Sequence, residues 1–431
     1  MSKFTIDKLG KGQFPNPLHS MLNFRYRADH EGLLLQPEVL SQADNTDNII
    51  LPSQTVLEMA GPREWLYFNP KQVRAAIVTC GGLCPGLNAV IRGLVMQLWH
   101  VYGSQDILGI RFGYHGLGND AIEPLTLTPD VVSPIKSLGG TILGSSRGTP
   151  PTSELVANLQ KHQINMLFVI GGDGTMRGAD ALWQEIKRQH LEIAVVGIPK
   201  TIDNDIPYTR RTFGFDTAVA EAMQAINIAE VEAKGMPNGI GLVKLMGRHA
   251  GFITATACVA SGHPNFCLIP EVDFALDGEN GLLALLERRL AARHHAVIVV
   301  AEGAGQHLVQ GVGTDASGNK KLGDIGTYLN EKINAHFKSK GWQFGLKYIE
   351  PSYLIRSAPP SAFDQLYCDQ LARAAVHAAM AGKGGMLIGD WNGRLTHIPM
   401  SALQGASRRV NPNGELWFSV RENTGQPQVM G

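Results

Sequence analysis

Short apolar runs alternate with amphipathic stretches between residues 71 and 214. The apolar runs have the length of buried strands and lie at 73–80, 106–112, 165–172 and 193–199. The amphipathic stretches have helical spacing and lie at 88–103, 154–163 and 176–189. Alternation of this kind predicts right-handed βαβ crossovers around a parallel sheet that is covered on both faces.

The same alternation resumes after Thr217 and predicts a second α/β unit. A long helical segment at 218–234 comes first, and the strand-like runs IGLVKLM, FCLIP and HAVIVVAEG follow. Residues 311–323 are small, polar and rich in glycine, so we expect a surface loop there. A helix is predicted from about Ser361 to Ala381, before the strand-like GGMLIGDWNG.

The first 70 residues lack a sustained period. They are polar and punctuated by proline, with only the short apolar pieces LLLQPEVL and NIILP. We interpret residues 1–70 as an N-terminal extension to the α/β units.

Charge and composition exclude several classes of protein. Lys+Arg and Asp+Glu both number 38, so the formal net charge is zero and no nucleic-acid or anionic-membrane partner is indicated. No apolar run approaches the roughly 20 residues that cross a bilayer, and the first residues contain no hydrophobic signal core. The odd count of five cysteines makes no disulfide framework, which favours a cytoplasmic location.

Glycine is abundant, at 49 of 431 residues, and it gathers where strands end. Ligands enter open α/β sheets at the carboxyl ends of the strands. In TCGGLCPGLNAVIRG a strand ends at Cys80, Gly81 and Gly82 expose their backbone, and a helix starts near Asn88. Bare amides beside a helix N-terminus make an anion site, although for a single glycine pair an ordinary tight turn is the favoured interpretation.

A second glycine-rich turn, GGDGT, encloses an acid. Gly172 and Gly174 flank Asp173 directly after an apolar strand. Glycines let a polyphosphate approach the backbone, but the carboxylate would repel it unless a cation such as Mg²⁺ intervenes. A metal–phosphate site is therefore favoured over a solvated turn aspartate.

A third cluster, PKTIDND, joins a lysine to two acids. Beside Lys200, one of Asp203 and Asp205 could serve as a general base while the other orients that base or a metal ion. A simple Asx-turn cluster explains the same residues about equally well. Arginines that follow strands or glycine turns have the fork geometry that suits phosphate oxygens, although each alone is more typical of a surface ion pair: Arg147, Arg248 and Arg356.

Taken together, these motifs resemble the 6-phosphofructokinase family. The resemblance extends from about Arg74 to Gly389 and rests on seven motifs in register: GGLCPGLNAVIRG, GGTILGSSRG, GGDGT, PKTIDND, FGFDTA, MGRHAGF and PEVDF. It implies two parallel-sheet α/β domains that face a central cleft. The implied division is an extension at 1–70, a donor-binding domain at 71–214 completed by 356–400, a sugar-phosphate domain at 215–355 and a C-terminal tail at 401–431.

The resemblance implies an enzyme that moves the γ-phosphoryl group of ATP to the 1-hydroxyl of fructose 6-phosphate with Mg²⁺. Asp203 matches the general base, and Thr201, Asp205 and Arg147 complete the catalytic set. Asp173 matches the magnesium-associated acid. The donor-binding residues implied are Gly82, Tyr114, Arg147, Gly148, Gly172, Asp173, Gly174, Thr175 and Lys200.

The same resemblance assigns the acceptor side. Met246, Gly247 and Arg248 match a sugar-phosphate motif, and Glu302 matches an acceptor for a sugar hydroxyl. The remaining implied substrate-binding residues are Thr201, Ile202, Asp203, Lys347, Tyr353, Leu354, Ile355 and Arg356. Members of the family are dimers or tetramers, so we expect a homo-oligomer.

Two positions bear on the phosphoryl donor. Gly174 is typical of ATP-using members, because an aspartate there would crowd and repel the α-phosphate, whereas Lys200 is typical of diphosphate-using members. The combination of Gly174 with Lys200 resembles the ATP-dependent group of plant and trypanosomatid members, so we expect ATP to be the phosphoryl donor. Gly239 replaces an arginine that, in many bacterial members, reaches the neighbouring subunit's substrate.

Three other functions remain compatible with parts of the sequence. The first is a phosphotransferase that uses diphosphate, and the second is a phosphosugar sensor without activity. The third is a dinucleotide-dependent oxidoreductase, although GGLCPG lacks the spacing of the dinucleotide fingerprint.

Overall fold

The computed structural model describes residues 3–20, 25–36, 55–119, 121–309, 311, 313 and 321–431, and the backbone alone of residues 40–42 and 45–50. Most of the loop predicted at 311–323 therefore lies outside the described residues. The chain divides into two compact units. Unit 1 contains residues 1–201, 206–213 and 359–407, and unit 2 contains 202–205, 214–358 and 408–431. The predicted boundaries at 70, 214, 355 and 400 stay a prediction.

Unit 1 is built on a nine-stranded mixed sheet. Its parallel centre has the spatial order β9 (Asp106–Ile110), β8 (Arg74–Thr79), β11 (Met166–Gly171), β12 (Ala194–Pro199) and β18 (Met386–Trp391). Antiparallel strands flank it: β10 (Leu125–Thr126) beside β9, then β19 (Arg394–Pro399), β6 (Val56–Met59) and β3 (Gly32–Leu34) beyond β18. The parallel centre confirms the prediction, while the antiparallel edges were not foreseen.

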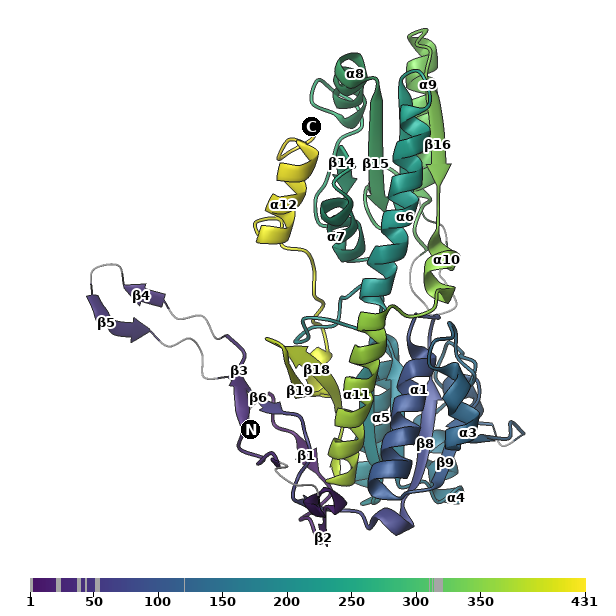
Figure 1. Cartoon of the computed structure of the whole chain (residues 1–431), viewed down its shortest axis with the longest axis vertical. Coiled ribbons are helices and arrows are strands. Elements are labelled where there is room, and N and C mark those ends of the chain that lie inside the picture. Colours follow the sequence, from purple (N-terminus) through teal and green to yellow (C-terminus); the bar gives the residue numbers. More distant parts are fainter. Residues whose placement is uncertain are drawn as a thin grey trace. The chain divides into compact units, whose positions relative to one another are not determined.

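Helices cover both faces of this sheet, as the alternating pattern predicts (Figure 1). Helices α1 (Leu87–Met96), which continues as a π-helical turn over Gln97–Tyr102, and α11 (Ala362–Met380) pack against each other. Helices α4 (Thr152–Lys161) and α5 (Asp173–Arg188) form the other layer. Shorter elements are α2 (Gly113–Leu117), α3 (Pro129–Val132) and the 3₁₀ turns Pro70–Gln72, Ser133–Ile135 and Met400–Leu403.

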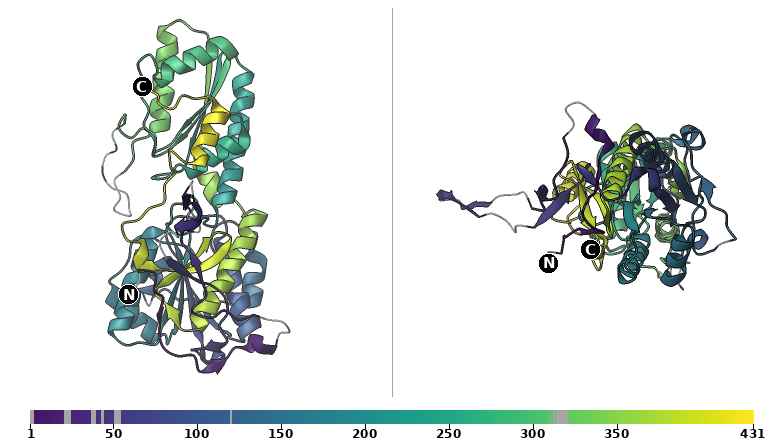
Figure 2. Two further views of the ribbon diagram at one scale, coloured as in Figure 1. Left: turned by 90° about the vertical axis from the view of Figure 1, so that its left-hand side faces the viewer. Right: turned by 90° about the horizontal axis from the view of Figure 1, so that it is seen from below.

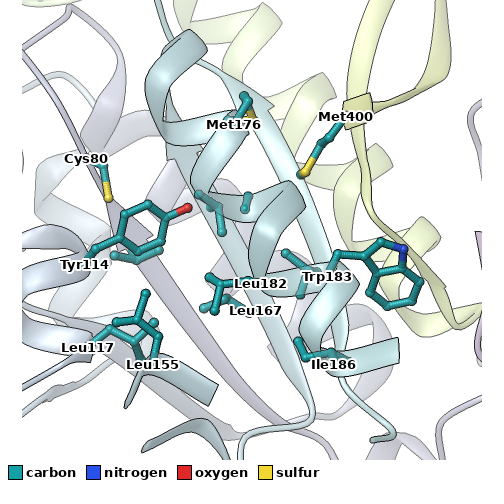
Figure 3. Close-up of a cluster of buried hydrophobic side chains, with 14 of the residues drawn as sticks. Cys80, Tyr114, Leu117, Leu155, Leu167, Met176, Leu182, Trp183, Ile186 and Met400 are labelled. Atoms are coloured by element: carbon teal, nitrogen blue, oxygen red, sulfur yellow. The ribbon is translucent and has the colours of Figure 1, made fainter. Parts of the chain in front are cut away.

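A continuous core joins α4 and α5 to the sheet (Figure 3). Trp183 and Ile186 of α5 point to the sheet, and Leu167 of β11 and Leu155 of α4 are fully buried beside them. Burial of each such side chain contributes about 1.5–3 kcal/mol, so this layer holds α5, which begins at the GGDGT motif, rigidly on the sheet.

The N-terminal segment, which lacked a sequence period, is a structural part of unit 1. Strands β3 and β6 extend the large sheet beside β19, and the purple segment lies along the yellow-green hairpin in Figure 2. Three further pairs of strands are short: β1 (Asp7–Lys8) with β17 (Lys383–Gly384), β2 (Phe14–Pro15) with β7 (Trp65–Leu66), and β4 (Leu40–Gln42) with β5 (Asn45–Ile50). A 3₁₀ turn spans Pro17–Ser20.

A buried ionic network fastens this segment to the sheet. Lys383, with a side chain only 1% exposed, contacts Glu58 at 2.6 Å and Asp29 at 2.9 Å. Arg63 also binds Asp29, and buried His397 lies 2.8 Å from Glu58. Burial lowers the pKa of Lys383, and the nearby Glu58 opposes that shift. The cluster is stable only as a set, because any missing partner leaves a buried charge uncompensated.

Replacement of Lys383 by methionine is therefore expected to destabilise unit 1 by about 3 kcal/mol, since it removes the buried cation that Glu58 and Asp29 share and leaves the buried Glu58 short of positive charge. The melting temperature should fall, and limited proteolysis should cut the first 70 residues faster. Lys187→Met is the matched control: Lys187 also binds the N-terminal segment, at Asp7, but both side chains are about 40% exposed and such pairs contribute under about 1 kcal/mol. Equal stability losses in the two variants would contradict a special role for the buried network.

Unit 2 has a four-stranded parallel sheet in the order β14 (Phe266–Leu268), β15 (His295–Ala301), β13 (Gly239–Leu245) and β16 (Gly345–Ile349). Its larger helices are α6 (Phe215–Lys234), α7 (Phe252–Ser261), α8 (Leu282–Arg293) and α9 (Ile325–Ser339). The core of one face is made by α8 and α9, while α6 and α7 pack together, with α12 (Glu415–Thr424) against α7. The short α10 (Ser352–Ser357) follows β16. In the described part of the chain, no helix is long and apolar enough to span a membrane.

Candidate active site

Three turns, two of them rich in glycine and one beginning with Lys200, lie together at one edge of the sheet of unit 1. Strands β8, β11 and β12 are parallel neighbours, so the residues after them share the carboxyl edge. The backbone N–H of Cys80 donates to Ile170 at 2.9 Å, and that of Lys200 donates to Gly171 at 2.9 Å. The structure thus brings together the turn at 80–82, the GGDGT turn and Lys200, which we call the donor loop group.

The GGDGT turn presents free backbone donors. Helix α5 begins at Asp173 after Gly172, and no side chain caps it. The first amides of a helix have no acceptor within it and attract anions. A Cβ on Gly82 would meet nothing within 4 Å, and one on Gly174 would come only as near as 3.6 Å to Arg177 Nη2. Protein packing therefore does not require these two glycines, and the space beside them is available to a ligand.

Lys200 points toward the first of these turns. It is only 6% exposed, and its ammonium donates to the carbonyl of Gly82 at 2.7 Å. A buried ammonium at a turn of bare amides adds a positive charge where a phosphate would lie.

The GSSRG motif is bound to the same turn. Ser145 Oγ donates to the Gly81 carbonyl at 2.6 Å, and the Gly81 N–H donates to the Ser146 carbonyl at 3.0 Å. Exposed Arg147 follows, and Gly148 has a φ of +87°, a conformation that favours glycine. Ser146 is an addition to the predicted set: its Oγ is buried and has no hydrogen-bond partner among the described residues. A polar group of this kind is typical of a ligand contact.

Asp173 forms an ion pair with Arg177, one helical turn further along α5. The i,i+4 spacing in GGDGTMRG is the signal that sequence analysis overlooked. No cluster of three His, Cys, Asp or Glu side chains in the described part of the protein could hold a metal. Asp173, nearly half exposed, still fits Mg²⁺, because that ion is commonly bound by one or two carboxylates together with substrate phosphates.

Tyr114 supports the GGDGT turn from behind. Its side chain is 1% exposed within the core cluster, and its hydroxyl donates to the Thr175 carbonyl at 2.9 Å (Figure 3). Burial raises its pKa well above the usual value. The structure thus places Tyr114 and Thr175 with the donor loop group, but Tyr114 acts by holding the turn.

In unit 2, the residues of the predicted base and sugar-phosphate motifs gather around Asp203. Strands β13 and β15 are neighbours that end at Leu245 and Ala301, so Met246 and Glu302 follow them directly. Loss of water is the largest of the effects that raise the pKa of Asp203 to about 7; the charges of Asp205 and Glu302 add to it, and Arg356 opposes them. We call Asp203, Asp205, Arg248, Glu302 and Arg356 the Asp203 group. A carboxylate with a pKa near 7 suits a general base at neutral pH.

Two interlocked turns position Arg248 and Glu302. The Glu302 N–H donates to Leu245 at 2.9 Å, and the Gly303 N–H donates to Gly247 at 3.2 Å. Gly247 has a φ of +123°, and a Cβ there would lie 2.7 Å from the Ala250 carbonyl, so glycine is required. Burial raises the pKa of Glu302, and Arg356 and Arg248 lower it.

Other predicted substrate residues have different surroundings. Met246 and Ile202 are buried, and Ile355 is fully buried on α10. Tyr353 and Leu354 are 80% and 73% exposed. Lys347 faces α6, where its ammonium lies 3.8 Å from Glu232. Thr201 belongs to unit 1, where its carbonyl accepts a hydrogen bond from Thr212 at 2.7 Å.

The C-terminal segment supplies residues that sequence analysis treated as a tail. The Arg408 N–H donates to the Asp205 carbonyl at 2.9 Å, and its guanidinium donates to Asn204 at 3.2 Å while lying 4.5 Å from the Phe252 ring. Burial lowers the pKa of His249, as do Arg248 and Arg409. This segment contains no recognisable motif, and the adjacent arginines at 408–409 are the one feature of its sequence that indicates such a contact.

These turns on a parallel sheet define a phosphotransferase-like α/β protein, and comparison with known proteins identifies its family. Residues 74–379 match the family model described as phosphofructokinase, and the chain belongs to that family. This removes the basis for the oxidoreductase alternative.

Several similar proteins are described as ATP-dependent 6-phosphofructokinases. The chain is 48% identical to an ATP-dependent 6-phosphofructokinase of Borreliella burgdorferi, over 99% of this chain and 97% of that protein. ATP-dependent 6-phosphofructokinase 7 of Arabidopsis thaliana is 50% identical over 86% of this chain and 77% of its own length. The Trypanosoma brucei brucei enzyme is 43% identical over 97% and 86%. The predicted similarity to the plant and trypanosomatid group is confirmed.

Solved structures support the fold. A pyrophosphate-dependent phosphofructokinase from Marinobacter aquaeolei aligns with a TM-score of 0.68, covering 83% of this chain and 92% of that chain at 21% identity. Saccharomyces cerevisiae phosphofructokinase aligns with a TM-score of 0.62, covering 82% and 48% at 22% identity. At these identities the likeness concerns the fold alone.

Proposed function

We propose that this protein transfers the γ-phosphoryl group of ATP to the 1-hydroxyl of fructose 6-phosphate, giving fructose 1,6-bisphosphate and ADP in glycolysis. The observation that carries the proposal is the donor loop group: a carboxylate, a buried lysine and uncapped helix amides around glycines that protein packing does not require. The relatives described as ATP-dependent enzymes support ATP as the donor.

In this proposal the donor loop group holds the triphosphate. The amides at the start of α5 and the ammonium of Lys200 bind phosphate oxygens, and Arg147 offsets the charge on the transferring group. Asp173 would hold Mg²⁺, which supplies charge neutralisation to the phosphates. Arg177 would then give up its ion pair with Asp173.

The Asp203 group binds and activates the sugar phosphate. Arg248 and Arg356 attract the 6-phosphate, and Glu302 accepts a hydrogen bond from a sugar hydroxyl. Asp203 removes the proton from the 1-hydroxyl as its oxygen bonds to the γ-phosphorus, and the bond from that phosphorus to the bridging oxygen of ADP breaks. Asp205 raises the pKa of Asp203 through its charge. We also propose that the enzyme works as a homo-oligomer in the cytoplasm.

A donor comparison tests the proposal. Purified protein with fructose 6-phosphate and Mg²⁺ should form fructose 1,6-bisphosphate with ATP, and at least 100-fold more slowly with diphosphate. The product is measured through a coupled aldolase assay. Turnover with diphosphate alone would refute the choice of donor and favour the diphosphate enzyme. Sugar-phosphate binding without turnover on either donor would favour the sensor.

A further inference from the structure

Glu271, the first acid of the PEVDF motif, lies shortly after β14 and binds two backbone amides with its half-buried side chain. Its Oε1 accepts from the Gly251 N–H at 2.9 Å and from the Val410 N–H at 2.8 Å, and its Oε2 accepts from Gly251 at 3.1 Å. Burial raises the pKa of Glu271, and the two amides lower it because they donate to the charged form. One side chain therefore joins two segments that are far apart in the sequence.

The first of these amides fixes the turn that carries Arg248. Gly251 ends residues 246–251, which we call the Arg248 turn, and helix α7 begins at the next residue. A Cβ on Gly251 would lie 2.4 Å from Ile269 Cβ, so only glycine brings this amide close enough to the carboxylate. Hydrogen bonds from the segment after β15 hold the other end of the turn, so Arg248 is fixed from both sides.

The second amide belongs to the C-terminal segment, where Val410 is only 2% exposed. Two residues earlier, Arg408 donates from its backbone to the Asp205 carbonyl and from its guanidinium to the Asn204 carbonyl. The same guanidinium lies 4.5 Å from the centre of the Phe252 ring, at the start of α7. Residues 408–410 therefore support the loop that carries the proposed base, and Glu271 holds them in place.

The far end of the C-terminal segment is fixed to unit 2 by other contacts. Gln426 exchanges hydrogen bonds with the backbone of Cys267 in β14, at 2.7 and 3.3 Å, and the Ala275 N–H donates to the Met430 carbonyl at 2.7 Å. Helix α12 lies between these contacts and residues 408–410, and it packs on α7 (Figure 1). Loss of the bond to Val410 should therefore loosen residues 408–410 without detaching the segment.

A helix cap alone does not explain the position of Glu271. A capping side chain bonds the amides at the second or third position of its helix. Glu271 instead bonds Gly251, which precedes α7, and Val410, which lies outside that helix. Its negative charge suits the positive end of α7, but its contacts join two elements that both belong to the surroundings of the Asp203 group.

We propose that Glu271 is a positioning residue for the binding of the sugar phosphate. Through one amide it fixes the turn that presents Arg248 to the 6-phosphate, and through the other it holds Arg408 against the loop at 202–205. This inference rests on the proposed function, because that function supplies the role of Arg248.

Steady-state kinetics of Glu271→Ala separate this role from a general loss of stability. The KM for fructose 6-phosphate is expected to rise about 10-fold or more, because the 6-phosphate is remote from the reacting oxygen and its arginine contributes mainly to binding. The KM for ATP should change less than about 3-fold, and kcat less than about 10-fold. An unchanged KM for fructose 6-phosphate, or an equal rise in KM for both substrates, would overturn the proposal.

Two further variants sharpen that comparison. Glu271→Gln keeps an acceptor oxygen for both amides and should return the KM for fructose 6-phosphate to within about 3-fold of the native value. Asp273→Ala is the matched control, since it removes the second acid of the same motif, whose side chain is 92% exposed, and should leave this KM within about 2-fold. A loss in Asp273→Ala equal to that in Glu271→Ala, or no recovery in Glu271→Gln, would contradict the assignment.

Hydrogen exchange without substrates tests the two contacts independently of activity. In Glu271→Ala the amides of Gly251 and Val410 should exchange about 10-fold faster or more, while those of β13 keep their native rates. Faster exchange at only one of the two amides, or at neither, would overturn the proposal. If the native protein showed no kinase activity, the proposed function would fail, and the exchange rates would still decide whether Glu271 positions both segments.

Discussion

With Asp203 replaced by asparagine, kcat for phosphorylation of fructose 6-phosphate by ATP is expected to fall by about 10³-fold, within the range for loss of a general base. Asparagine keeps the size of the side chain but cannot accept the proton. The dissociation constant for fructose 6-phosphate, measured by calorimetry, should change less than 10-fold, because Arg248 and Arg356 remain. A comparable loss in binding would instead assign Asp203 to substrate affinity.

The pH dependence separates these roles further. The pKa of Asp203 is raised to about 7, so kcat/KM of the native protein should decline as pH falls below about 7 and the base becomes protonated. Stability changes with pH in the opposite direction: because the pKa of this carboxyl is raised in the folded state, stability is lost as pH rises from about 4 to about 7 and the loss is complete above that range. Asp203→Asn should therefore have a higher melting temperature than the native protein at pH 8, and a similar one at pH 4. Equal melting temperatures at pH 8 would contradict the proposed burial of charge.

Gly174→Asp should lower kcat/KM for ATP by at least about 100-fold, because a like charge brought against a phosphate costs several kcal/mol. The protein itself accommodates a Cβ at this position, which would lie 3.6 Å from Arg177 Nη2 at the nearest. Any loss must then come from the ligand and not from misfolding. Steady-state kinetics with ATP and fructose 6-phosphate measure the effect.

Gly174→Ala is the matched control for that variant. It adds a Cβ without charge at a position where glycine is not required, so less than a 10-fold change is expected. Severe loss in Gly174→Ala would show that the backbone, and not the added charge, determines donor binding. Unchanged ATP kinetics in Gly174→Asp would remove Gly174 from the donor site.

The parts of the fold that sequence predicts best are those with a strong period. The helix expected from Ser361 to Ala381 is α11, Ala362–Met380, and the apolar run after residue 165 is β11. The glycine turns were also informative, because glycine-rich turns directly after strands lie where ligands enter α/β sheets. Adjacent strand ends then place Gly82, Asp173 and Lys200 in one group.

Long-range contacts were beyond prediction. The antiparallel β6 and β3 have only four and three residues, and their place beside β19 depends on Glu58 and Lys383 meeting in space across 325 residues. The contact of Arg408 with Asp205 likewise joins residues that are far apart in the sequence, and no local sequence pattern indicates it. Tyr114 and Lys347 are of the residue types expected at a ligand site, but the direction in which each points is decided by packing, against Thr175 and Glu232 respectively.

The position of β6 also limits how far this chain can be shortened. A fragment cut to the family-matched residues 74–379 would lack β18, β19, β6 and β3 altogether, and one that began at residue 74 but kept the C-terminus would leave the edge of β19 bare. Unpaired strand edges recruit other chains, so such fragments would aggregate during expression. The minimal soluble enzyme therefore has to begin well ahead of its recognisable catalytic sequence.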